Sequence, residues 1–125
     1  MTRLKELYYC KICRNLVEVA GTGGGQLVCC GQGMTLLVAN TNEGATEKHV
    51  PVVKDLGERV EVTVGSVEHP MNDDHYITFI EVLANSEVYR KELKPGEKPV
   101  AEFSVRLADI IEVREFCNLH LLWKT

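Results

Sequence analysis

Apolar and polar residues alternate along much of the second part of the chain. The valines of segment 60–64 are separated by polar residues, and segment 101–105 repeats this two-residue period. Such a period is typical of a strand with one buried face. Further strands are predicted at 76–83, 87–93, 110–116 and 121–123, and Pro95-Gly96 marks a turn after the second of these.

The same pattern predicts the fold class. No segment has a convincing helical repeat, and β-branched residues are common from position 50 onward. Roughly six to eight short strands in about 85 residues predict an antiparallel β-sandwich of the immunoglobulin-like kind. The chain is therefore expected to be mainly β.

The first 38 residues differ in character from the rest. They hold four of the five cysteines, a glycine-rich stretch at 21–25, and apolar pieces too short to bury a core. Modules below about 40 residues normally need a metal, disulfides or a partner chain to fold. The polar segment 40–44 is interpreted as a linker. We therefore predict a metal-stapled module over 1–38, followed by a β-sandwich domain over 39–125.

Composition and charge exclude several classes of protein. Of the 125 residues, 45% are hydrophobic and 26% are charged, which is typical of a globular chain. The formal net charge of −4, without a stripe of lysine or arginine, argues against nucleic-acid binding. No segment resembles a signal peptide or a membrane span, so we expect no membrane attachment and a cytoplasmic location. In that reducing compartment, cysteines are expected as metal ligands or redox groups.

Two pairs of cysteines in the first module form a metal-binding motif. Cys10 and Cys13 have the C-x-x-C spacing of a metal knuckle, and Cys29 and Cys30 supply a second pair. Four thiolates with no other ligand favour tetrahedral iron or zinc. Adjacent cysteines tend to point apart, so their use as two ligands of one ion constrains the backbone. The spacing leaves two roles open, a structural staple or an electron-transfer centre.

A second group of candidate ligands lies in the β-sandwich domain. Its members are His49, His69, His75, Cys117 and His120. The histidines stand beside prolines or predicted turns, and the loops at one end of a sandwich are where such domains place sites. Imidazoles with one thiolate suit a redox metal or a catalytic zinc. A blue-copper site is a rival interpretation, but it would leave two histidines unused, and no methionine follows the last histidine.

Both groups resemble those of one known family. The C-x-x-C and C-C pairs resemble the desulforedoxin module, whose four cysteines hold a single iron. Glu-Lys-His-Val-Pro at 47–51, His-Pro-Met at 69–71 with His75 following, and Cys-Asn-Leu-His at 117–120 resemble the iron site of superoxide reductases of the neelaredoxin type. Together, in this order, they cover nearly the whole chain, as in desulfoferrodoxins, the two-iron superoxide reductases.

The resemblance implies a ligand set, a reaction and partners. The four histidines would be equatorial ligands of a second iron, with Cys117 as the axial thiolate and a sixth position open. Superoxide would be reduced by one electron to hydrogen peroxide, without release of dioxygen, in defence against oxidative stress. A rubredoxin-like electron donor and a homodimer are also implied.

Two further residues would be catalytic. Lys48 would supply local positive charge that attracts the anion, and it would orient a water for proton delivery. The resemblance implies that the Glu47 carboxylate binds ferric iron once the product has left. Their simplest alternative is that both are solvated surface residues.

Two functions of other classes compete with the enzyme. A small non-haem iron protein would carry electrons or store iron without meeting a substrate. A structural zinc protein would be colourless and would need no redox chemistry. Metal analysis joined to a visible spectrum separates these possibilities.

One segment departs from the family pattern. Family members often have glycine after the last ligand histidine, and often a further histidine before the tryptophan, whereas this chain has Leu121-Leu122-Trp123. We expect altered packing around the site, with the ligand set intact.

Overall fold

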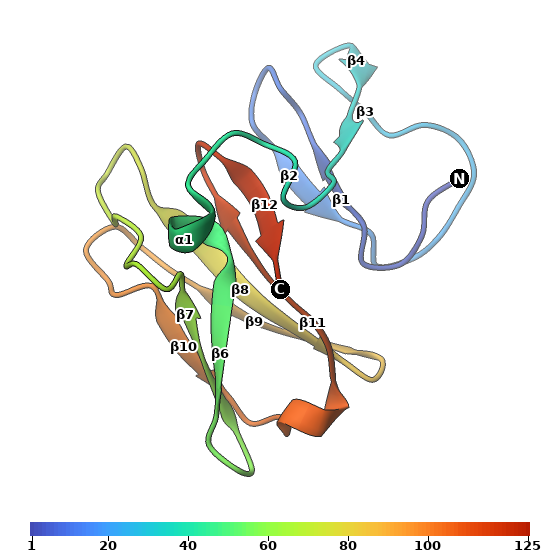
Figure 1. Ribbon diagram of the computed structural model, residues 1–125. Helices are drawn as coiled ribbons and strands as arrows, with labels where there is room; N and C mark the ends of the chain where they lie inside the picture. The colour runs from blue at the N-terminus through green and yellow to red at the C-terminus, as the bar shows by residue number, and fades with distance from the viewer. The chain divides into compact units, whose positions relative to one another are not determined.

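The computed structural model describes residues 1–125, which divide into two compact units, Met1–Val38 and Ala39–Thr125. The first unit is built from very short strands (Figure 1). They are β1 (Leu7–Tyr9), β2 (Leu16–Glu18), β3 (Val28–Cys29), β4 (Gln32–Gly33) and β5 (Thr35–Leu36). Strand β1 pairs with β2 and β5 in an antiparallel sheet, and β3 and β4 form a separate hairpin.

The apolar core of this first unit is very small. Its buried hydrophobic residues are Leu7, Tyr9, Cys10 and Val19. So few side chains remove too little apolar surface from water to offset the chain entropy lost on folding. The unit therefore needs a further source of stability, which a metal bound by its cysteines would supply.

The second unit contains two antiparallel sheets. One has three strands in the order β10-β7-β6, and the other has four in the order β12-β11-β8-β9. The strands of the smaller sheet are β6 (Pro51–Asp55), β7 (Val60–Val64) and β10 (Val100–Phe103). Those of the larger sheet are β8 (Ile77–Ala84), β9 (Glu87–Glu92), β11 (Ile110–Cys117) and β12 (Leu121–Lys124). Two single-turn helices complete the unit, α1 (Thr46–His49) and the 3-10 helix η1 (Leu107–Asp109).

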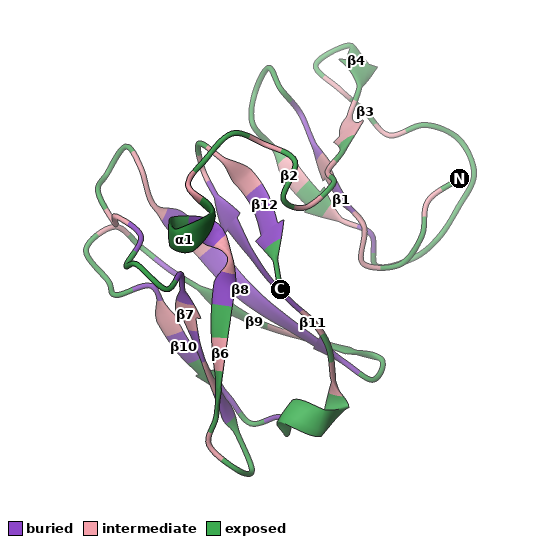
Figure 2. Cartoon of the chain, in the orientation of Figure 1, coloured by how far each residue is buried: buried purple, intermediate pink, exposed green.

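Alternation along the strands builds the core of the second unit. Val60, Val62 and Val64 are fully buried, while the residues between them are partly exposed. Buried residues follow β7, β8 and β11 in Figure 2. The core cluster consists of Val60, Val62, Val64, Ile77, Ile80, Val82, Ala84, Leu93, Ala101, Phe103, Val105, Val113 and Cys117. Cys117 thus lies at the end of the core, where β11 ends.

A buried ion-pair cluster crosses the larger sheet. In the strand register Glu81 of β8 stands between Arg114 of β11 and Arg90 of β9. The Glu81 carboxylate is fully buried, and it accepts hydrogen bonds from Arg114 Nε at 2.6 Å and from Arg90 Nε at 2.7 Å. Buried charges of this kind are stable only when they are paired and hydrogen-bonded.

The predicted fold class is confirmed, since the second unit has two antiparallel sheets and every predicted strand is present with its ends shifted by a few residues at most. Strand β6 was not predicted because it is a largely exposed edge strand that begins with Pro51. Helix α1 was not predicted either, because four residues are too few to form a repeat. Neither helix has the length or the apolar character that a bilayer span requires.

The interpretation of segment 40–44 as a linker is wrong. Asn40 is tied to β12, because its N–H donates to the Leu122 carbonyl at 3.0 Å and its side chain makes two hydrogen bonds with the Lys124 main chain. Gly44 lies against His49, His120 and Trp123. Polar composition suggested a solvated segment, but the main-chain N–H and the side chain of Asn40 are satisfied by β12.

Candidate metal centres

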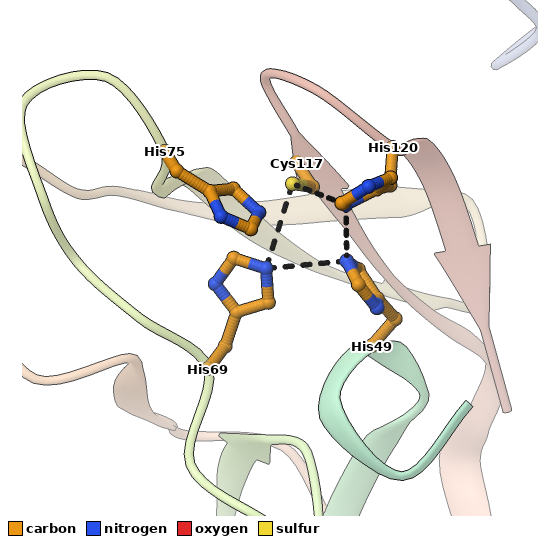
Figure 3. A group of neighbouring side chains, drawn as sticks. All are labelled: His49, His69, His75, Cys117 and His120. Carbon is orange, nitrogen blue, oxygen red and sulfur yellow. Dashed lines mark hydrogen bonds between the residues drawn. The ribbon is translucent and has the colours of Figure 1, made fainter. Parts of the chain in front are cut away.

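Five predicted ligands meet at one end of the β-sandwich. His49 ends α1, His69 follows the turn at 65–68, and His75 lies in the loop before β8. Cys117 ends β11, and His120 lies in the turn that leads to β12. Figure 3 shows the five side chains pointing toward one another, and one nitrogen or sulfur atom from each lies within 4.8 Å of all the others.

The hydrogen bonds of His49 and His69 fix which nitrogen faces the site. His49 Nδ1 donates to the Ala45 carbonyl at 2.8 Å, and His69 Nδ1 donates to the Pro70 carbonyl at 2.7 Å. In the neutral rings, both Nε2 atoms therefore carry lone pairs and no proton. These two Nε2 atoms are 3.2 Å apart. Two lone pairs at that distance repel each other unless a cation lies between them, so the arrangement fits a metal ion.

The remaining donors complete the same group. His120 Nδ1 lies 3.0 Å from His49 Nε2 and 3.8 Å from the Cys117 sulfur, which is itself 3.5 Å from His69 Nε2. His75 Nε2 is buried without any hydrogen-bond partner. A buried imidazole nitrogen left unpaired costs free energy, which coordination to a metal would recover. The donor set of four imidazoles and one thiolate suits iron.

Burial shifts the proton affinities of these groups. It lowers the pKa of His49 and His75, and it lowers the pKa of His69 to about 4. Burial also raises the pKa of the Cys117 thiol. The imidazoles of His49, His69 and His75 are therefore neutral at physiological pH, as metal ligands must be, whereas Cys117 keeps its proton until a cation replaces it.

Trp123 and Gly44 both pack against two of the histidines, His49 and His120. The Trp123 ring stacks on His49 with centroids 4.9 Å apart and an interplanar angle of 29°. Its Nε1–H donates to the His120 carbonyl at 2.9 Å. A Cβ on Gly44 would stand 3.1 Å from His49 and 3.2 Å from both His120 and Trp123, so this packing leaves room for glycine alone without displacement.

The segment that departs from the family pattern has an unusual backbone. Leu121 has φ 64°, in the left-handed region where glycine is favoured. A leucine in this conformation costs about 1–2 kcal/mol. Leu122 and Trp123 are both buried. The segment keeps the backbone that a glycine would adopt, and the ring of Trp123 still reaches His49.

Glu47 and Lys48 lie on α1 directly before His49, and both are exposed. Lys48 and His69 line the same groove, which has a volume of about 520 Å³ and whose other charged residues are Lys98, Glu68 and Glu97. The lysine is therefore brought to an opening that reaches one of the buried histidines. The Glu47 carbonyl is held by the turn at 65–68, and its carboxylate is free to face solvent.

The four cysteines of the first unit also converge. Their sulfur atoms lie within 4.8 Å of one another, and the Cys13 and Cys29 sulfurs are 3.5 Å apart. Cys29 and Cys30 stand at the turn of the β3–β4 hairpin, where Cys30 has φ 52° and Gly31 has φ 75°. This left-handed turn redirects the chain, which lets two adjacent side chains reach one point. The glycine-rich stretch at 21–25 is a separate loop before the hairpin.

Proton affinities in this cluster are strongly unequal. The Cys13 backbone N–H, 3.5 Å from the Cys10 sulfur, lowers the pKa of Cys10 to about 6. Interaction with the Cys13 side chain raises the pKa of Cys30 to about 12. Without a metal, some of these sulfurs therefore remain protonated thiols, and a bound metal cation would displace their protons. Cys13 and Cys30 are exposed, so a metal held here would lie close to the surface.

Several residues that shape the histidine site gave no signal in the sequence. The carbonyls of Ala45 and Pro70 act through the main chain, so their residue types reveal nothing. Glu115 is fully buried two positions before Cys117, and neither carboxylate oxygen has a hydrogen-bond partner. Burial raises its pKa well above the usual value. Its sequence context gave no hint, because β11 also contains the charged residues Glu112 and Arg114.

A β-sandwich that gathers four histidines and one cysteine, in a chain that begins with a four-cysteine module, defines a non-haem metal protein with two centres. Two family models match the chain, Desulfoferrodoxin over residues 41–125 and the N-terminal domain of Desulfoferrodoxin over residues 2–37. The chain belongs to the desulfoferrodoxin family, as its sequence motifs predicted. The family has a four-cysteine site and a site of four histidines and a cysteine, and both ligand groups are present here.

Known relatives extend over the whole chain. A desulfoferrodoxin homologue from Archaeoglobus fulgidus is 50% identical over 125 residues, which is 100% of this chain and 99% of the relative. The desulfoferrodoxin of Nitratidesulfovibrio vulgaris is 51% identical and covers 95% of this chain and 94% of its own length. The crystal structure of the superoxide reductase from Treponema pallidum is similar with a TM-score of 0.75 and 32% identity, covering 96% of this chain and 98% of that one.

Proposed function

We propose that this protein is a superoxide reductase, which reduces superoxide with one electron and two protons to hydrogen peroxide. The observation that carries the proposal is the pair of proton-free Nε2 atoms of His49 and His69, 3.2 Å apart beside the Cys117 sulfur. These atoms, with His75 and His120, would hold iron. Solved relatives of this fold are themselves superoxide reductases.

Iron at the histidine site would supply the electron and a positively charged position for the oxygen anion. The protein itself must then attract an anion, although its formal net charge is −4. Lys48 provides local positive charge at the groove that reaches His69. Its ammonium attracts superoxide and can hold a water from which protons reach the departing oxygen. We therefore assign Lys48 to substrate attraction and proton supply.

Cys117 and Glu47 have separate proposed roles at the histidine site. Cys117 is fully buried at the base of the group, so its sulfur is shielded from solvent and from oxidants. As a thiolate it would bind the metal and supply electron density to it. Glu47 is exposed one residue before Lys48, and we propose that its carboxylate would be a further ligand of the ferric metal once the product has left.

For the four-cysteine centre we propose a role in electron entry. Cys13 and Cys30 are exposed. A structural site does not need exposed ligands, so their exposure favours electron exchange with a small carrier such as a rubredoxin-like protein. Five free cysteines and no disulfide are consistent with the reducing cytoplasm.

We also propose that the protein is a homodimer. The first unit has a very small core, and its sheet exposes Val17 and Leu36 on either side of Tyr8 on one face. Apolar residues in a row across a sheet are typical of an interface. Sedimentation analysis of the iron-loaded protein tests this, and a monomer at micromolar concentration would contradict it.

Rapid mixing tests the proposed reaction. The reduced, iron-loaded protein is mixed with superoxide while absorbance, hydrogen peroxide and dioxygen are followed. A reductase gives second-order oxidation of the histidine-site iron and one peroxide for each superoxide consumed. An electron carrier or storage protein stays reduced, and a dismutase releases dioxygen, so either result rejects the proposal.

A further inference from the structure

The turn at 65–68 connects two parts of the chain that carry ligands of the histidine site. It leads directly into His69, and it also holds the main chain of α1, which carries Glu47, Lys48 and His49. The contact is concentrated on one atom, the carbonyl oxygen of Glu47. Val67 N–H donates to this oxygen at 2.9 Å, and the Ser66 hydroxyl donates to it at 3.2 Å.

Gly65 allows the close approach on which this contact depends. A Cβ at Gly65 would stand 2.5 Å from the Glu47 oxygen and 2.9 Å from the Lys48 carbonyl carbon. Such distances are shorter than real Cβ atoms tolerate, and the colliding atoms belong to the backbone, which cannot swing away. Only glycine permits the two backbones to lie so close together.

Helix α1 has little stability of its own. It contains four residues, and its N-cap residue Ala45 makes no side-chain capping bond. One helical turn is far below the length at which a helix is stable in water. The hydrogen bond from His49 to the N-cap residue Ala45 is local to the helix, so the contact that reaches α1 from outside is the turn at 65–68.

We propose that Gly65, Ser66 and Val67 form a seat that fixes the main chain of Glu47 and Lys48, and that Ser66 is a positioning residue for Lys48. The seat holds the Glu47 carbonyl, while the side chains of Glu47 and Lys48 move about that fixed point. The Lys48 ammonium is thereby kept over the groove beside His69. This inference rests on the proposed role of Lys48 in attracting superoxide.

The variant Ser66→Ala tests the seat in the full-length, iron-loaded protein. Ser66 is exposed, so the variant is expected to fold. Loss of one hydrogen bond should open the seat about fivefold more often, which raises hydrogen exchange at the Val67 amide by the same factor. Ser66→Thr, which keeps a hydroxyl, should restore the protection. Ser86→Ala, at an exposed serine in the β8–β9 turn, serves as the matched control.

A double-mutant cycle tests whether the seat acts through Lys48. In the Ser66→Ala protein, we expect superoxide capture to slow by up to about fivefold and its ionic-strength dependence to weaken, with the visible spectrum of the iron unchanged. In a Lys48→Ile background, Ser66→Ala should have no further effect on the rate.

Several outcomes would overturn the inference. Unchanged exchange at Val67 in Ser66→Ala would show that the hydroxyl does not hold the seat. An equal loss of rate in the presence and absence of Lys48 would show that Ser66 acts elsewhere. A wild-type protein that does not react with superoxide would instead reject the proposed function, and the exchange data would still decide whether the turn holds α1.

Discussion

Replacing Trp123 by phenylalanine should loosen the histidine site without unfolding the protein. The indole both stacks on His49, 4.9 Å between centroids, and donates to the His120 carbonyl at 2.9 Å. Phenylalanine keeps an aromatic face and loses the donor. An unpaired acceptor and a small gap together cost about 2–3 kcal/mol. For a domain of this size that lowers Tm by roughly 10–20 °C.

The effect on metal binding should be larger than the effect on folding alone. Residues that orient metal ligands typically contribute about 10–100-fold to metal affinity. We therefore expect Trp123→Phe to release iron to a chelator about tenfold faster than the wild type. Trp123→Leu, which lacks a ring, should lose iron faster still, because the stack on His49 disappears as well. The measurement is the decay of the thiolate-to-iron absorption after a chelator is added.

A control separates local from global loss of stability. Phe103→Leu removes an aromatic ring from the core at the end of β7 and β10, remote from the histidines. It should lower Tm with little change in iron release. The reasoning on Trp123 fails if Trp123→Phe and Phe103→Leu release iron at equal rates, or if Trp123→Phe releases it no faster than the wild type.

Three further predictions concern charge. Lys48→Ile should slow superoxide capture and flatten its dependence on salt, whereas Lys54→Ile, on exposed β6, should change neither; equal effects would remove the steering role. Burial lowers the pKa of His69 from 6.5 to about 4. Between pH 4 and pH 6.5 the unfolded chain therefore binds more protons than the folded protein. The free energy of unfolding of the metal-free protein should consequently decrease as the pH falls from 6.5 toward 4. Denaturant titrations across that range check the sign. Glu81→Gln should reduce unfolding free energy by about 3–5 kcal/mol, because Arg114 stays buried without its carboxylate; a change below about 1 kcal/mol would show that the pair is not buried as described.

Residue type and spacing predicted the chemistry of both candidate centres. Cysteines and histidines are rare enough in such a chain that their positions identify candidate ligands, and the structure brings each set together. Strands with strict alternation, such as β7, were equally visible because one face is buried and the other is not. These features reside in side chains, which a sequence states directly.

Features that depend on the main chain were not predictable. Helix α1 exists because Gly65 and Val67 hold it from a distant part of the chain, and no local pattern encodes that contact. The carbonyls of Ala45 and Pro70 orient two histidines, although any residue type offers a carbonyl. Segment 40–44 looked like a linker because it is polar, and the partners that Asn40 finds on β12 are supplied only by the fold.

The facing Nε2 atoms of His49 and His69 also bear on how the protein obtains the correct metal. Their repulsion is relieved by any divalent cation, and copper and zinc bind such nitrogen sites more tightly than ferrous iron does. The donor atoms of the histidine site therefore favour the binding of a divalent cation, but they do not select ferrous iron over copper or zinc. Fidelity to iron has to come from the supply of metals in the cell, and protein made under zinc excess and iron starvation should accumulate as a colourless, inactive form.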